Sequence, residues 1–164
     1  MRARAATISD ASAIADIYNE GIADRTATFE TRQRTADDVL AWFEGRYPIV
    51  VVEHEGVIAA FASTSSYRTR ECYAGIAEAS VYVARAWRGR GAGRIALEAL
   101  IENAARAGYW KLVARIFPEN RASRRLILSL GFREVGTYEK HGRLDGVWRD
   151  VIIVERLISV NVQP

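Results

Sequence analysis

The sequence predicts one α/β domain with a mixed, mostly antiparallel central sheet flanked by helices. Three observations carry this prediction. Of the 164 residues, 49% are apolar and 26% are charged, which suits one compact core. Segments with the two-residue period of strands alternate with segments of helical period. Near the middle, a strand-like run passes into an alanine-rich helical pattern through a basic, glycine-rich loop, Arg88–Arg94.

The N-terminal half is expected to form a strand, two helices and a hairpin. Ser9 or Asp10 is placed to cap the first helix, and Thr35 with Asp38 forms a capping-box pattern at the start of the second. Pro48 ends that helical pattern. The expected segments are a strand over 3–8, helices carrying Ile14, Ile17, Tyr18 and Ile22 and then Val39, Trp42 and Phe43, and strands over 49–53 and 57–64.

The C-terminal half is expected to alternate strands and helices before a final hairpin. Gly108 and Gly131 are natural helix ends, Asn120 is a natural helix cap, and Asp145-Gly146 is a hairpin signal. The expected segments are a strand over 80–83, a helix from 91 to 108, a strand over 110–117, a helix from 120 to 131, and strands over 132–139 and 147–157. The predicted order is β-α-α-β-β-β-α-β-α-β-β.

The loop between the central strand and its helix has the chemistry of a pyrophosphate site. The first turn of a helix offers N–H groups without intrahelical partners and the positive end of the helix dipole. Glycines at 89, 91 and 93 let an anion approach the backbone, and the neighbouring arginines add positive charge. The loop lacks the Gly-Lys-Ser/Thr ending of a P-loop and the third glycine of a dinucleotide fingerprint. A plain Gly/Arg surface loop remains the alternative.

Composition narrows the classes of ligand. The net charge is +3 and the arginines are scattered, which favours a small anionic ligand and not nucleic acid. A single cysteine excludes an internal disulfide and is typical of a reducing cytoplasm. Two distant histidines predict no metal site. No apolar run is long enough for a signal peptide or a membrane span, so we expect a cytoplasmic protein without membrane contact.

Two motifs flank the central helix. Arg88, Gly91 and Gly93 form R-x-x-G-x-G directly after a Val-Tyr-Val strand, and Asn120 and Ser123 form N-x-x-S ahead of a Gly-Phe pair. Together, and over essentially the full chain, 1–164, they resemble the GNAT superfamily of N-acetyltransferases. Taken alone, Asn120 is also explained as a helix cap. The resemblance implies a single acetyltransferase domain with acetyl-CoA as co-substrate. It implies contacts to acetyl-CoA from Val81, Tyr82, Val83, Arg88, Gly89, Arg90, Gly91, Ala92, Gly93, Arg94, Asn120 and Ser123.

Other segments are similar to one branch of this superfamily. Asn19, the run 28–31 and the run 67–83 resemble the phosphinothricin and methionine sulfone acetyltransferases. Within that group, segments 73–83, 108–112 and 141–150 look most like the arsinothricin-resistance enzymes, which acetylate the α-amine of glutamate-like oxyacid amino acids. The resemblance implies a homodimer, with Val147 and Trp148 as candidate contacts.

The family chemistry assigns roles to particular residues. An α-ammonium must lose a proton before its nitrogen can attack a thioester, and Glu78 stands where the family has its base. A glutamate merely paired with an arginine is the alternative. Backbone N–H groups around Val81–Val83 are the expected oxyanion donors. Many relatives carry a tyrosine acid on the N-x-x-S helix, whereas this chain has Ile127 at that position.

The substrate pocket is expected to hold an oxyanion and a carboxylate. The guanidinium groups of Arg68 and Arg70 suit both anions. The alternative is that this arginine-rich segment is simply a solvated surface. The candidates by resemblance are Phe29, Glu30, Tyr67, Arg68, Arg70 and Tyr73. Two other functions stay open: an acetyltransferase for methionine sulfone, methionine sulfoximine or another small amine, and a non-catalytic acyl-CoA-binding module.

Overall fold

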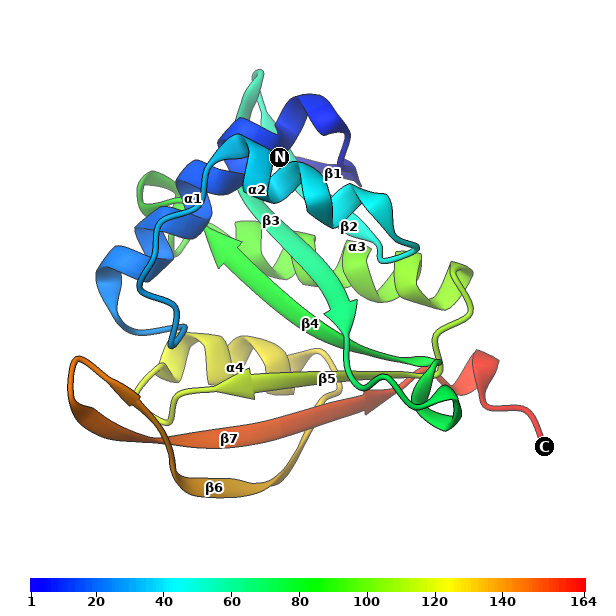
Figure 1. Ribbon diagram of the computed structural model, residues 1–164. Helices are drawn as coiled ribbons and strands as arrows, with labels where there is room; N and C mark the ends of the chain where they lie inside the picture. Colours follow the sequence, from blue (N-terminus) through cyan, green and yellow to red (C-terminus); the bar gives the residue numbers. More distant parts are fainter.

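The computed structural model, which describes residues 1–164, has seven strands in one sheet and four α-helices on its two faces (Figure 1). The order of elements is the predicted one, and the mixed α/β fold is confirmed. None of the helices combines the length and apolar character needed to cross a bilayer. The elements are β1 (Arg2–Ala5), α1 (Ala11–Asp24), α2 (Ala36–Leu40), β2 (Ile49–His54), β3 (Val57–Ser66), β4 (Ile76–Val83), α3 (Ala92–Arg106), β5 (Lys111–Ile116), α4 (Arg121–Ser129), β6 (Arg133–Leu144) and β7 (Val147–Leu157).

The sheet opens between its two central strands. The strand order is β1-β2-β3-β4-β5-β7-β6, and every neighbouring pair is antiparallel except β4 and β5. These two parallel strands pair only from Ile76↔Lys111 to Glu78↔Val113. Both continue further, β4 to Val83 and β5 to Ile116, and Figure 1 shows them diverging. Beyond Glu78, one edge of β4 therefore has no strand partner.

The alternation of side chains on β2 divides the core into two layers. Val50 and Val52 face α3 and belong to the larger apolar cluster, while Ile49 and Val51 face α1 and α2 and belong to the smaller one. This period of two is the property of a strand buried on both faces. The sheet is therefore covered by α1 and α2 on one side and by α3 and α4 on the other.

Small residues bring α3 close to the sheet. Ala96 and Ala104 are fully buried on the helix, and Ala60, Ala62 and Ala77 are fully buried on the strands beneath it. Leu97 and Leu100 are buried between them. Ile95 and Ile101 are only partly buried, because both lie at the margin of the helix–sheet contact.

The N-terminal junction differs from the prediction. β1 ends at Ala5, three residues early, and Ile8 lies in an exposed 3₁₀ turn. Asp10, one of the two expected caps, is the N-cap residue of α1, but its side chain makes no capping hydrogen bond to that helix. Thr7 caps the 3₁₀ turn before it, and the Thr7 backbone N–H donates to Asp10 Oδ2 at 2.8 Å. Asp10 also pairs with Arg4 of β1 at 2.8 Å, so its carboxylate ties the strand to the helix.

Most other element ends agree with the prediction within a few residues. Thr35 and Asp38 form the expected capping box, and Gly108 and Gly131 have the left-handed backbone that ends a helix, with φ of 89° and 85°. The main exception is β6, which continues to Leu144, five residues beyond the expected end, because it pairs with β7 across two register shifts.

Candidate active site

Two cavities meet at the gap between β4 and β5. The loop cavity, of about 480 Å³, lies on the α3/α4 face, between the glycine-rich loop, the end of β4 and α4. The aromatic cavity, of about 850 Å³, lies on the α1/α2 face. The gap itself belongs to both, and the residues that line both cavities are Ala27, Ala79, Ser80, Tyr82, Arg115, Ile116 and Phe117.

The glycine-rich loop presents unpartnered backbone donors to the loop cavity. None of the N–H groups from Gly89 to Arg94 donates a hydrogen bond to another backbone group. Gly89 and Gly91 have φ of 73° and 85°, and a Cβ at either position would meet nothing within 4 Å. Gly93 has another reason, since its Cβ would press on Val83 and Leu126 at 3.1 and 3.2 Å. Open space lined by free N–H groups fits a phosphate anion.

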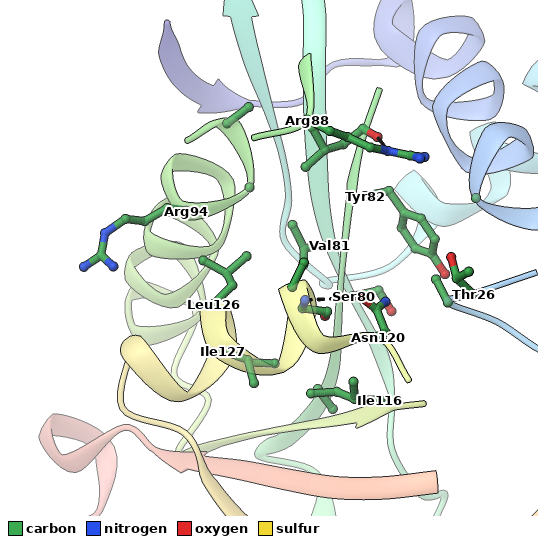
Figure 2. Close-up of a pocket in the computed structure, with 18 of the residues that line it drawn as sticks. Thr26, Ser80, Val81, Tyr82, Arg88, Arg94, Ile116, Asn120, Leu126 and Ile127 are labelled. Atoms are coloured by element: carbon green, nitrogen blue, oxygen red, sulfur yellow. Dashed lines mark hydrogen bonds between the residues drawn. The ribbon is translucent and has the colours of Figure 1, made fainter. Parts of the chain in front are cut away.

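The three arginines of the loop are placed differently. Arg88 lines the loop cavity and pairs with Asp24 at 2.7 Å. The guanidinium of Arg94 pairs with Glu98 at 2.9 Å and points away from the cavity in Figure 2. Arg90 lies over the ring of Trp87 at 5.4 Å and does not line the cavity. All the other residues expected to contact acetyl-CoA line it.

Asp24 fixes one end of this loop. Its carboxylate accepts a hydrogen bond from Arg85 at 2.7 Å in addition to the ion pair with Arg88. The bonds from Arg85, followed by those from Arg88, hold the pKa of the Asp24 carboxyl below its usual range. The loop is thus tied back to α1 by a carboxylate that stays ionised at neutral pH.

The far wall of the loop cavity is formed by α4. Asn120 caps this helix by accepting from the Ser123 N–H at 3.2 Å (Figure 2). Leu126 and Ile127 face the end of β4, where the backbone edge beyond Glu78 has no strand partner. Ile127 is buried, so the position of the tyrosine acid in many relatives is an apolar wall here.

Four aromatic rings build one side of the aromatic cavity. Tyr18 makes edge-to-face contacts with Trp42 and Tyr82, at centroid distances of 5.7 and 5.0 Å, and Phe61 stacks on Tyr82 at 5.4 Å. Such packing holds the rings in fixed orientations. Burial raises the pKa of the Tyr82 hydroxyl far above its usual range, and that of Tyr18 also rises. Both hydroxyls therefore stay protonated at neutral pH.

The loop after α1 supplies the opposite side. Asn19 clamps it by accepting from the Arg34 N–H at 2.7 Å and donating to the Arg34 carbonyl at 2.8 Å. The Arg34 guanidinium pairs with Glu30 at 2.8 Å. Phe29 packs edge-to-face on Phe117 at 4.9 Å. Phe29 and Glu30, both expected in the substrate pocket, therefore line the aromatic cavity.

Glu78 lies at the point where β4 and β5 separate. It forms the last residue pair between the strands, with Val113, and its side chain lines the aromatic cavity at 26% exposure. Its carboxylate Oε1 lies 3.2 Å from Nε of Arg115 on β5. A carboxylate at this place can accept a proton from a group that enters the gap.

The remaining predicted substrate residues lie elsewhere. Tyr67 and Tyr73 pack edge-to-face on each other at 6.1 Å, with Arg68 over the first ring and Arg70 near the second. These four residues lie between β3 and β4 and do not line the aromatic cavity. Their role in substrate binding stays a prediction.

Sequence reasoning missed several residues of the two cavities. Arg34, Glu44 and Arg115 are the charged ones. Gly21, which lines the loop cavity, is buried in α1, where a Cβ would meet the Tyr82 ring at 2.8 Å. A glycine in the middle of a helical pattern was the available signal for Gly21. Arg115 gave none, since alternation within a strand does not reveal which strand separates from its neighbour. No group of three or more His, Cys, Asp and Glu side chains could hold a metal ion.

The fold and the paired cavities have the arrangement that an acyltransferase needs: a glycine-rich loop with free backbone N–H groups on one face, a pocket lined by charged and aromatic side chains on the other, and a gap that connects them. The acetyltransferase (GNAT) family model matches residues 14–132. The chain therefore belongs to the GNAT family, and it is an N-acetyltransferase with acetyl-CoA as its co-substrate.

Two relatives match this chain over nearly the whole length of both proteins. The chain is 35% identical to the L-methionine sulfoximine/L-methionine sulfone acetyltransferase of Salmonella typhimurium, over 100% of this chain and 98% of that protein. It is 32% identical to the phosphinothricin N-acetyltransferase of Streptomyces viridochromogenes, over 98% of this chain and 90% of that protein.

Solved structures of acetyltransferases have the same fold as this chain. An acetyltransferase from Salmonella typhimurium, determined with its cofactor acetyl-CoA, has a TM-score of 0.94 at 35% identity, and the match covers 100% of this chain and 97% of that one. A phosphinothricin acetyltransferase from Sinorhizobium meliloti in complex with acetyl-CoA has a TM-score of 0.87 at 28% identity, over 94% and 86% of the two chains.

Proposed function

We propose that this enzyme transfers an acetyl group from acetyl-CoA to the α-amine of a glutamate-like oxyacid amino acid, of the arsinothricin or phosphinothricin type. Acetylation would remove the charge of the amine and confer resistance to the toxic amino acid. The single observation that carries the proposal is the meeting of the loop cavity and the aromatic cavity beside Glu78. The exposed, unpaired Cys72 suits a reducing cytoplasm as the place of action.

The loop cavity is the candidate site for acetyl-CoA. The unpartnered N–H groups from Gly89 to Arg94 would hold its pyrophosphate, with Arg88 adding positive charge. Asn120 and Ser123 would flank its pantetheine arm. When bound, acetyl-CoA supplies an activated acetyl group at the gap.

Glu78 would act as the base. Its carboxylate accepts the proton of the α-ammonium, directly or through water, and the freed nitrogen forms the new C–N bond to the acetyl carbon. The unpaired edge of β4 around Val81–Val83 supplies N–H donors for the oxyanion. When the C–S bond breaks, the sulfur leaves as a thiolate of moderate pKa. Ile127 offers it no proton, so this position supplies no side-chain acid, and the moderate pKa of the thiolate lets it leave without one.

Methionine sulfone or methionine sulfoximine is the second candidate substrate. The relative at 35% identity carries that name, while another at 32% is named for phosphinothricin. The charge lining the aromatic cavity includes both signs, with Arg34 and Arg115 beside Glu30, Glu44 and Glu78. We place the oxyacids first because segments 73–83, 108–112 and 141–150 look most like the arsinothricin-resistance enzymes, which act on glutamate-like oxyacid amino acids.

Release of free thiol from acetyl-CoA tests the proposal directly. Purified protein is assayed with arsinothricin, phosphinothricin, methionine sulfone and methionine sulfoximine, each beside glutamate. We expect saturable release with an oxyacid, a higher KM for the sulfone, and none with glutamate. Turnover confined to the sulfone and sulfoximine would select the second candidate. Absence of release with all four would overturn both.

We also propose that two copies associate through the β6–β7 hairpin. Five apolar side chains on these two strands are at least half exposed, which is unusual for a surface of a monomer. They are Val135, Tyr138, Val147, Trp148 and Leu157.

A further inference from the structure

Arg115 occupies a unique position between the two cavities. Of the seven residues that line both cavities, it is the only one with a charged side chain. Its neighbours Ala114 and Ile116 are buried beneath the sheet, whereas the Arg115 side chain is 41% exposed on the opposite face. A substrate whose amine reaches Glu78 lies near this guanidinium, because Arg115 Nε is 3.2 Å from Glu78 Oε1.

The register of β5 explains this position. Glu78 pairs with Val113, and side chains two residues apart on a strand share a face, so Arg115 shares the face of Glu78 one step beyond the last pair. On its other edge β5 remains paired with β7, through Arg115↔Ile153. The backbone of Arg115 is thus held by the sheet while its side chain reaches across the opening.

The guanidinium of Arg115 retains capacity to bind an anion. Its one ion-pair contact with Glu78 is made through Nε, which leaves both terminal amino groups without a protein acceptor. Arg34, the other arginine of the aromatic cavity, is paired through its terminal amino group with Glu30. Two free N–H-bearing nitrogens on a planar fork suit a carboxylate.

We propose that Arg115 binds the α-carboxylate of the amino-acid substrate and so positions the α-amine against Glu78. This inference rests on the proposed function. The amine and the carboxylate of an α-amino acid share one carbon, so the group that binds the carboxylate must lie within a few ångström of the base. Arg115 meets that condition, with Nε 3.2 Å from the Glu78 carboxylate. The oxyacid end of the side chain is several bonds away and is bound elsewhere in the cavity. Arg115 is therefore a specificity residue that selects α-amino acids over other amines.

The test compares Arg115→Gln and Arg115→Lys with the wild type on two versions of one substrate, the free amino acid and its α-carboxamide. In Arg115→Gln we expect KM for the amino acid to rise on the order of 10- to 100-fold, with a smaller change in kcat. The kcat/KM for the carboxamide should fall much less than that for the amino acid, so the preference for the carboxylate disappears. Arg115→Lys should restore part of that preference.

Arg133→Gln is the matched control, because Arg133 also pairs with a glutamate, at 2.6 Å, but lines neither cavity. Thermal melting and acetyl-CoA titration verify that each variant is folded. An Arg115→Gln or Arg115→Lys enzyme that keeps the full carboxylate preference would overturn the inference while leaving the proposed function standing. A wild-type enzyme that acetylates none of the amino acids would overturn the proposed function and the inference with it.

Discussion

Glu78 illustrates how the surroundings of a residue distinguish it from another residue with the same pairing. A glutamate paired with an arginine across two strands is common, and Glu53 on β2 is a second example, paired with Arg4 at 3.0 Å. Glu53 lies in continuous sheet and lines neither cavity, whereas Glu78 lies where the sheet opens. The two carboxylates differ in access to a ligand and not in their immediate chemistry.

Replacing Glu78 with glutamine therefore tests the base at the scale of one residue. Glutamine keeps the size but cannot accept the proton of the ammonium, so kcat should fall by about 10²- to 10⁴-fold. The acetyl-CoA dissociation constant should not change, because Glu78 does not line the loop cavity. Initial rates and calorimetric titration measure the two quantities. Glu53→Gln should retain full activity, and a Glu78→Gln enzyme within twofold of the wild type would remove Glu78 from the mechanism.

At the scale of elements, the strand–loop–helix unit depends on glycine for two separate reasons. Gly91 needs its left-handed backbone at the start of α3, and Gly93 needs the absence of a Cβ for packing on β4 and α4. A similar close approach fixes the start of β4, where a Cβ at Gly75 would overlap the Trp110 ring at 1.9 Å. The backbone of Gly75 accepts from the Trp110 N–H at 2.8 Å, which sets β5 beside β4.

Gly91→Ala separates ligand binding from backbone strain. The left-handed conformation costs an alanine about 1–2 kcal/mol, and its Cβ would occupy the open space assigned to the pyrophosphate. Gly56, in the β2–β3 turn, has a φ of 79° and equally open space, but lies outside both cavities. Urea unfolding should show similar losses for Gly91→Ala and Gly56→Ala. Only Gly91→Ala should weaken acetyl-CoA binding, by about tenfold or more. Equal acetyl-CoA affinities of the two variants would contradict the assignment of this loop to the pyrophosphate.

The junction of β1 and α1 gives a pH-dependent prediction. The hydrogen bond from Arg4, with further bonds from Thr7, lowers the pKa of the buried Asp10 carboxyl below its ordinary 3.8. A lowered folded-state pKa contributes stability above the unfolded pKa, and this contribution is lost as pH falls through the folded value. Asp10→Asn should cost about 1.5–3 kcal/mol at neutral pH, because the neutral amide loses the charge-assisted hydrogen bonds from Arg4.

Urea unfolding of the wild type and Asp10→Asn between neutral pH and pH 3 measures this effect. The difference in unfolding free energy should be constant near neutrality and should shrink below about pH 4. A difference that stays the same down to pH 3 would show that the ionised carboxylate is not the source of the stability.

At the scale of the whole molecule, the sheet is covered on both faces except near its β6–β7 edge. Nine of the first ten residues of β6 are exposed, and Trp148 on β7 is half exposed with Arg143 over its ring at 4.4 Å. Exposed apolar residues on an uncovered edge favour association with a second copy.

Light scattering after size exclusion tests this association. The wild type should have about twice the chain mass of 18.3 kDa. Trp148→Glu places a charge in the apolar surface and should shift the protein to the monomer. Val57→Glu, on an exposed apolar residue at the β2–β3 turn, should leave the mass unchanged. A monomeric wild type, or a Trp148→Glu variant of unchanged mass, would contradict the proposal.

Local sequence patterns were sufficient for most of the elements and for one cavity. The order of strands and helices, the capping box at Thr35, and the helix ends at Gly108 and Gly131 follow from rules that involve residues close in sequence. The residues of the loop cavity could be predicted for the same reason, because a glycine-rich turn at a helix N-terminus is a contiguous segment. Arg90 is the exception, because its side chain turns to Trp87.

The sequence by itself determined the α/β fold, the glycine-rich loop at the start of a helix and the family resemblance, because each depends on short contiguous patterns. Only the tertiary structure decided where the sheet opens, since strand separation depends on the register between β4 and β5, whose paired residues, such as Ile76 and Lys111, are 35 positions apart along the chain. That opening places Arg115 beside Glu78 and joins the two cavities. Contacts between residues distant in sequence carry no local signal, and the substrate side of the active site is built from such contacts.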